Sequence, residues 1–128
     1  MTWTIIIPAE VPSQNETEKG RCHFARARRT KERRRAWCFW CGSEIVRADI
    51  PLATGKRRLH VIAYRKRLCS DIANLIGGFK ACADGLVDAC LLQDDRDTKA
   101  MITYEQQLAS ASPLGRGKTC TLLQIKDA

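Results

Sequence analysis

The chain has 128 residues, 45% of them hydrophobic and 28% charged, so it is long enough for one domain with a core of its own. No apolar run reaches the length of a membrane span, and the first residues lack the features of a secretion signal. We therefore expect a cytosolic protein with no membrane partner. The net charge is +8, and up to Cys69 there are 16 lysines and arginines against 6 acidic residues. Such a basic half favours a polyanionic partner, and a basic surface that only maintains solubility is the alternative.

Four segments have the β-branched composition or the alternating pattern of strands, at 3–7, 56–64, 99–108 and 118–126. In the second segment, Leu59, Val61 and Ala63 fall on one side of the strand. The small, Pro/Gly-rich stretch 109–117 predicts a hairpin loop between the last two strands.

Two stretches predict helices. Residues 21–40 are rich in Ala, Arg, Lys and Glu, and Gly42 is placed to end that helix, with an irregular connection over 43–55. Apolar residues between 72 and 90 recur at spacings of three and four, with Ser70 or Asp71 as the N-cap. The chain thus predicts one α+β (α/β) domain over 1–128, with a small mixed sheet of about four strands packed against two helices.

Acidic residues gather over 67–97. Asp71 stands at a strand–helix junction, Lys80, Asp84 and Asp88 recur every four residues, and Asp94-Asp95-Arg96-Asp97 follow the helix. Carboxylates of this kind suit Mg²⁺, or Mn²⁺ in its place, beside a phosphate group that a lysine can help to stabilise. The structural alternative is a capping aspartate, a Lys–Asp pair within the helix and an acidic turn.

The same region resembles a known family. Asp71-Ile72-Ala73-Asn74-Leu75, Lys80, Asp84, Leu86 and Asp94-Asp95 are similar in order and spacing to the signature of the RusA-like Holliday junction endonucleases. Gly77-Gly78-Phe79-Lys80 resembles the longer form of that signature, and Pro12-Ser13-Gln14-Asn15 resembles the loop after the family's first strand. The similarity is close over about residues 67–95 and loose elsewhere.

The resemblance implies a homodimeric, RusA-like nuclease that nicks four-way (Holliday) junctions in DNA recombination and repair, without a small-molecule cofactor. It implies Asp71, Asp94 and Asp95 as metal ligands and Asp71, Lys80 and Asp95 as catalytic residues, with Asn74 and Asp84 as supporting residues of the motif. Ala73 stands where the family has a second aspartate, and alanine cannot bind a metal. Either Asp94 or Asp97 compensates, or the chain is a DNA-binding protein with weak or no cleavage.

A basic region over 15–42 predicts the nucleic-acid contacts, because arginine side chains match the geometry of phosphates. A second basic cluster lies around 56–67. Together they supply the residues that we expect to contact the DNA backbone without reading its sequence: Arg26, Arg28, Arg29, Lys31, Arg33, Arg34, Arg65 and Arg67.

Seven cysteines without an export signal favour reduced thiols, and those at 69, 82, 90 and 120 lie in apolar segments that predict burial. Cys38-Phe39-Trp40-Cys41 has the spacing of a zinc or redox site, for which Cys22-His23 would supply further ligands. Bulky Phe39 and Trp40 indicate core packing instead, so we do not expect zinc.

Overall fold

The computed structural model describes residues 1–15, 23–96 and 98–128. These residues form an α+β domain with one four-stranded mixed sheet, three α-helices and the 3₁₀ turn η1 (Ala109–Ala111). The predictions made for Arg21, Cys22 and Asp97 lie outside the described residues. The strands and helices are β1 (Thr2–Ile7), α2 (His23–Ala48), β2 (Arg57–Arg65), α3 (Ile72–Gly78), α4 (Lys80–Asp88), β3 (Ala100–Leu108) and β4 (Cys120–Asp127).

The strands follow the order β1-β4-β2-β3 across the sheet. β2 and β3 are parallel, so the chain needs a crossover between them, which α3 and α4 supply. β4 lies between β1 and β2 and is antiparallel to both. The predicted hairpin over 109–117 is therefore wrong: β2 separates β3 from β4, and the intervening segment crosses over the end of the sheet.

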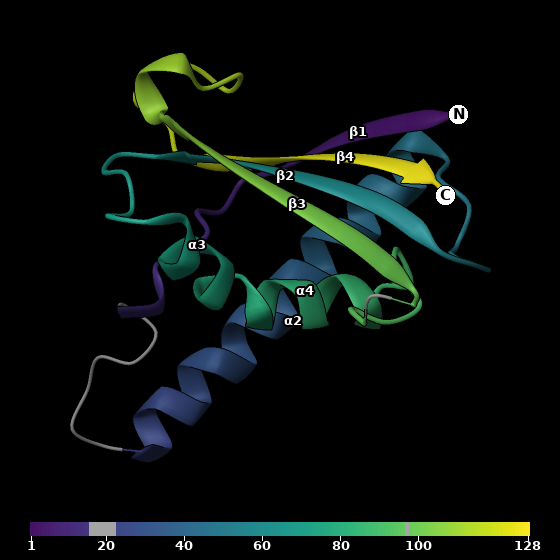
Figure 1. Cartoon of the computed structure of the whole chain (residues 1–128), viewed down its shortest axis with the longest axis horizontal. Coiled ribbons are helices and arrows are strands. Elements are labelled where there is room, and N and C mark those ends of the chain that lie inside the picture. The colour runs from purple at the N-terminus through teal and green to yellow at the C-terminus, as the bar shows by residue number, and fades with distance from the viewer. Residues whose placement is uncertain (16–22, 97) are drawn as a thin grey trace.

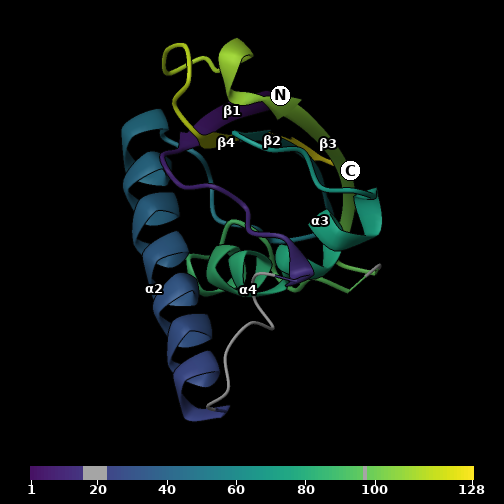
Figure 2. The same ribbon diagram turned by 90° about the vertical axis from the view of Figure 1, so that its left-hand side faces the viewer.

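The helices form a second layer on one face of the sheet (Figures 1 and 2). Alternate residues of each strand face this layer, so that Leu59, Val61 and Ala63 are buried as their spacing predicted. Ile5 and Ile7 of β1 and Leu123 and Ile125 of β4 complete the sheet side of the core. No described helix covers the opposite face.

Helix α2 continues past Gly42, which we predicted would end it, and terminates at Ala48. A glycine inside a helix costs about 1 kcal/mol relative to alanine. Burial of Cys41 and Ile45 on either side of it offsets that cost. The helix ends with Asp49 at a φ of 53° and the Ile50 amide donating to the Ile45 carbonyl. Among the described residues no helix is long and apolar enough to cross a membrane.

The single helix predicted over 72–90 is two helices that meet at Phe79. The Phe79 amide donates to both the Leu75 and the Ile76 carbonyl, which tightens the chain at this point. Gly77 and Gly78 precede the break, and glycine has low helix propensity. Phe79 itself is buried and packs edge-to-face on Trp37 of α2 and Tyr104 of β3. The break thus turns an aromatic side chain into the centre of the core.

Helices α2 and α4 pack closely because Gly85 has no side chain. A Cβ at Gly85 would lie 2.6 Å from the Arg34 carbonyl oxygen and 2.8 Å from the Trp37 Cβ. The contact brings the basic half of α2 beside the acidic residues of α4.

Candidate active site and nucleic-acid interface

Asp71 is the N-cap of α3, as its position in the sequence predicted. Its Oδ1 accepts a hydrogen bond from the Asn74 amide at 3.0 Å, which satisfies one of the free amides at the helix start. The Asn74 side chain in turn donates to the Ser70 hydroxyl at 3.1 Å. Both motif residues therefore have a structural task at this junction, and the exposed Ala73 lies between them.

Lys80 joins two acidic segments. Its Nζ donates to Asp84 Oδ1 at 3.1 Å, one helical turn along α4, and also to Asp95 Oδ2 in the turn that follows α4. The Lys80 side chain is 66% exposed, whereas those of Asp84 and Asp95 are 28% and 24% exposed. Asp94 lies next to Asp95 and pairs with the Arg96 guanidinium at 3.3 Å. The structure thus brings Lys80, Asp84 and the Asp94–Asp95 pair together at the surface.

The charges in this group favour one another's ionised forms. The hydrogen bond from Lys80 lowers the pKa of Asp95 below its ordinary value, and partial burial opposes that effect. The hydrogen bond to Asp95 raises the pKa of Lys80. Both side chains are therefore charged at neutral pH.

Tyr104 of β3 lies close to this group, and the sequence analysis did not single it out. Burial raises the pKa of its phenol, and the negative charge of Asp95 raises it further. Tyr104 also packs edge-to-face on Phe79, which ties it to the core. The only sequence signal for Tyr104 was the alternation of β3, which puts it on the same side as Ala100 and Ile102.

Asp71 does not join the Asp94–Asp95 pair as a third carboxylate. Within the residues described, no three His, Cys, Asp or Glu side chains lie close enough to share one metal ion. The pair alone still fits Mg²⁺, which usually takes one or two carboxylates and completes its coordination with water and phosphate oxygens.

The segment after β1 and the glycine pair at the end of α3 lie against each other. A Cβ on Gly78 would collide with the Pro12 carbonyl oxygen, and one on Gly77 would collide with the Gln14 side chain. The close approach of the segment after β1 to α3 therefore requires glycine at position 78, where the clash is with backbone, whereas at position 77 the Gln14 side chain could move aside. This contact holds the C-terminal end of α3 against the segment that follows β1.

The N-terminal half of α2 extends beyond the body of the domain (Figures 1 and 2). Most of the predicted phosphate contacts lie there and face solvent: Arg28, Arg29, Lys31 and Arg34 are exposed, and Arg26 and Arg33 are half-buried. Exposed cations on a projecting helix are accessible to a polyanion such as a nucleic-acid backbone.

Arg34 connects this basic surface to α4. Its guanidinium forms two parallel hydrogen bonds with Asp88, from Nε to Oδ2 at 2.6 Å and from Nη2 to Oδ1 at 2.8 Å. The hydrogen bond to Asp88 raises the pKa of Arg34, and the bond from Arg34 lowers the pKa of Asp88. Asp84 lies 4.0 Å from Arg34 Nη1. Arg34 is therefore an ion-pair partner of α4 as well as a surface cation.

Arg65 was predicted to contact DNA, and the structure corrects this. Only 3% of Arg65 is exposed, and its guanidinium donates to the carbonyls of Val11 and Arg67. Arg57, in the same basic cluster, is 2% exposed and bonds Asp127 and the Leu91 carbonyl. Both side chains lie on the face of β2 that packs against the core, because alternate residues of a strand share a face and Arg57 and Arg65 alternate in step with Leu59. Arg67, by contrast, is exposed.

The cysteines only partly follow the predictions. Cys82 and Cys120 are buried, Cys69 is half-buried and Cys90 is exposed. Among the described residues, Cys38, Cys41, Cys82, Cys90 and Cys120 form no disulfide. Burial raises the pKa of Cys41 to about 12. Phe39 and Trp40 are 67% and 39% exposed and pack on each other, so the prediction that they are core residues is wrong. They lie on the outer side of α2, because Trp37, Cys41 and Ile45 occupy its buried face.

No protein-family model matches the chain, and no curated protein matches it.

Proposed function

We propose that this protein is a divalent-metal-dependent endonuclease of the RusA-like kind that binds branched DNA and nicks its phosphodiester backbone. The observation that carries the proposal is the group of Lys80, Asp84 and Asp95, with Asp94 adjacent to Asp95. A cation held between two carboxylates, with a third carboxylate adjacent, is a suitable environment for a negatively charged phosphodiester and a metal ion.

Each residue of the group has a task in this proposal. Asp94 and Asp95 would hold the metal ion, which when bound would polarise the scissile phosphate and lower the pKa of a bound water. Lys80 is the most exposed member of the group, so it can turn from Asp95 towards a phosphate and offset the charge that develops on its oxygens. Asp84 holds the lysine on its other side.

The basic part of α2 serves as the surface for the DNA backbone. It packs on α4 through Gly85 and through the Arg34–Asp88 pair, so the helix that carries these cations is fixed against the helix that carries Lys80. Phosphate contacts of this kind orient a duplex arm without selecting a sequence, which agrees with recognition of a branched shape. A homodimer would present two such sites to the two symmetric strands of a four-way junction.

Nicking of a synthetic four-way junction, compared with a linear duplex of the same arm sequence, tests the proposal with and without Mg²⁺. We expect metal-dependent nicks in the junction only. D95N should reduce the nicking rate on the order of 10²- to 10³-fold, the loss typical of a removed transition-state contact. Junction binding without cleavage by the unmodified protein at any Mg²⁺ or Mn²⁺ concentration would overturn the catalytic part.

Asp71 can be tested separately from its capping role. Asparagine caps a helix about as well as aspartate, so D71N keeps the hydrogen bond to Asn74 while it removes the charge. A loss of nicking as large as that of D95N, with unchanged thermal stability, would identify Asp71 as a metal ligand. Unchanged nicking would limit Asp71 to capping α3.

A second candidate function is DNA binding without cleavage. Ala73 and the separation of Asp71 from the Asp94–Asp95 pair favour it, because they leave the site with few carboxylates. Since Ala73 is exposed, Ala73→Asp can be made without disturbing the core. A large gain in nicking would indicate a site weakened by the missing acid, and no gain would favour either compensation or a binding role.

A further inference from the structure

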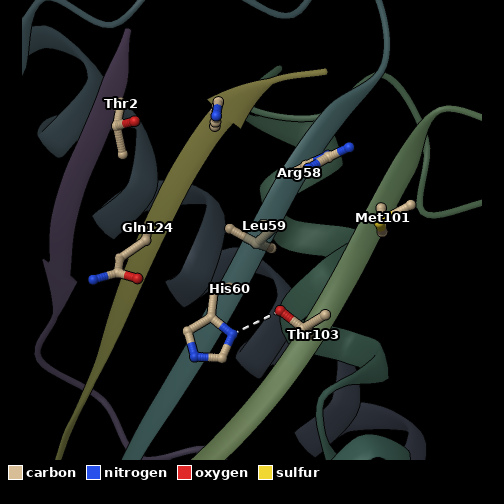
Figure 3. A pocket seen from close by; sticks show the side chains of 8 residues that line it. Thr2, Arg58, Leu59, His60, Met101, Thr103 and Gln124 are labelled. Atoms are coloured by element: carbon tan, nitrogen blue, oxygen red, sulfur yellow. Dashed lines mark hydrogen bonds between the residues drawn. The ribbon is translucent and has the colours of Figure 1, made fainter.

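The face of the sheet opposite the helices carries a pocket of about 330 Å³. Its side chains come from all four strands and stand on the open face, with Arg58 and His60 from β2, Gln124 from β4 and Thr2 from β1 (Figure 3). Lys126 of β4 and Thr103 of β3 also line it. The pocket is remote from the Lys80 group, which lies in the helical layer on the other face.

Two cations on neighbouring strands line this pocket. Arg58 and Lys126 are register partners in the antiparallel pair of β2 and β4. Side chains that lie directly opposite on neighbouring strands have Cβ atoms about 5 Å apart, and like charges in that position are destabilising. Both side chains are exposed to solvent, so packing in the core does not fix their positions.

The nearby acids do not compensate these charges. Among the described residues, neither Arg58 nor Lys126 has an ion-pair or hydrogen-bond partner. Asp127, next to Lys126 in the chain, is bonded to Arg57 on the helical side of the sheet. Glu105 is on the open face, and its carboxylate contacts His60 and Gln107.

The rest of the lining is partly apolar, from Leu59 and Met101, and partly polar, with His60 fixed by its neighbours. His60 Nδ1 lies 2.6 Å from Thr103 Oγ1, and its Nε2 lies 3.5 Å from Glu105 Oε1, so both ring nitrogens have partners (Figure 3). Thr2 and Gln124 are exposed beside Lys126 and supply a hydroxyl and an amide group. The pocket therefore combines two uncompensated cations with neutral hydrogen-bond donors.

We propose that this pocket binds a phosphate group, which Arg58 and Lys126 hold between them while Thr2 and Gln124 donate hydrogen bonds. The arginine fork and the lysine ammonium are the usual partners of phosphate oxygens. One anion between the two side chains converts their repulsion into two attractive contacts. The ligand is a phosphate monoester or diester, as found in free phosphate, nucleotides or a nucleic-acid backbone.

Titration of the full ¹⁵N-labelled chain with inorganic phosphate, without divalent metal, tests the site by NMR. We expect saturable shifts of the amides of Thr2, Arg58, His60 and Lys126. In R58Q/K126Q these shifts should require at least tenfold more phosphate. The control K99Q/K118Q removes the same charge from two other exposed positions and should titrate as the unmodified protein does. Equal titration of all three proteins, or shifts elsewhere in the chain, would overturn the proposal.

Thermal unfolding gives a second measurement on the same proteins. In phosphate-free buffer R58Q/K126Q should unfold at the same temperature as the unmodified protein or higher, because it loses a repulsion. Added phosphate should raise the unfolding temperature of the unmodified protein and of K99Q/K118Q more than that of R58Q/K126Q. A larger increase for R58Q/K126Q would contradict the site. R58Q alone serves if the double variant is poorly folded.

A further titration with the oligonucleotide octathymidylate distinguishes the possible sources of the phosphate. Binding that is at least tenfold tighter than that of inorganic phosphate, and that depends on Arg58 and Lys126, identifies a nucleic-acid backbone as the ligand. Equal affinity identifies free phosphate or a nucleotide. Because this experiment contains no metal and measures no cleavage, its result is independent of the proposed nuclease activity.

Discussion

Two arginine-rich stretches of this chain have opposite fates. In the first, the N-terminal half of α2, most arginines face solvent, because this part of the helix extends past the body of the domain. In the second, around β2, Arg57 and Arg65 are buried and hydrogen-bonded, while Arg58 is exposed on the other face. The comparison shows that a count of positive charges does not identify a nucleic-acid surface. Whether an arginine reaches solvent depends on its position in the repeat of its strand or helix and on which elements pack over it.

The two buried arginines serve the fold. Arg57 joins β2 to Asp127 at the end of β4 and to the Leu91 carbonyl after α4, and it stacks over the Trp3 ring at 5.2 Å. Arg65 donates to the Val11 carbonyl after β1. Each guanidinium thus satisfies carbonyl groups in irregular segments that have no strand partner. Predictions that separate the two stretches follow from this difference.

The largest effect is expected for Arg57→Gln. The change leaves the Leu91 and Pro51 carbonyls without their donor, and each buried acceptor left unsatisfied costs about 1–3 kcal/mol. Asp127, whose side chain is 63% exposed, stays hydrated. Urea unfolding followed by circular dichroism measures the loss. The matched variant Arg28→Gln, on exposed α2, should stay within about 0.5 kcal/mol of the unmodified protein. Equal losses in both would refute the division between the two stretches.

A smaller effect, on DNA affinity alone, is expected for Arg28, Arg29 and Arg33 changed together to alanine. Each phosphate contact contributes about 0.9 to the slope of log K against log salt, so the slope should fall by about 3 and the affinity at physiological salt by on the order of 10²-fold. Fluorescence anisotropy with a labelled junction gives both quantities. Alanine preserves the helix. The control with Lys99, Arg116 and Lys118 changed to alanine should bind more tightly than this variant; the same affinity would indicate a nonspecific charge effect.

The smallest effect concerns the Arg34–Asp88 pair and its pH dependence. Arg34 lowers the pKa of Asp88 in the folded protein, so the pair stabilises the fold above the unfolded-state pKa of about 3.9 and loses this contribution as the pH falls through the folded-state pKa. Arg34→Gln should therefore unfold at a lower temperature than the unmodified protein at pH 6. The difference should shrink below pH 4, and a difference that stays constant to pH 2 would contradict the assignment.

Much of the fold could be predicted because local patterns determine it. The alternation in 56–64, 99–108 and 118–126 located three strands within two residues of their ends. Gly42 and the 109–117 loop were misjudged for one reason: both predictions used local breakers alone. Burial of Cys41 and Ile45 carries α2 past its glycine, and β2 occupies the place next to β4 that a hairpin would have given to β3.

The candidate site also contains contacts that local sequence patterns predict and contacts that depend on the tertiary fold. The Lys80–Asp84 contact follows from helical spacing, and Asp71 is the cap that its position predicted. The contact of Lys80 with Asp95 depends on how the turn after α4 folds back, and the neighbouring Tyr104 comes from a strand further along the chain. No periodicity links those positions.

The sequence by itself determined the strands, the polar stripe of α4 and the strongly basic character of α2, because hydrophobic period and helical spacing act over a few residues. Only the tertiary structure decided which arginines reach solvent, where the long apolar helix breaks at Phe79, and that Arg58 opposes Lys126. These outcomes depend on strand order and on close approach at Gly78 and Gly85. The physical reason is that burial and pairing between distant segments are properties of the packed chain as a whole.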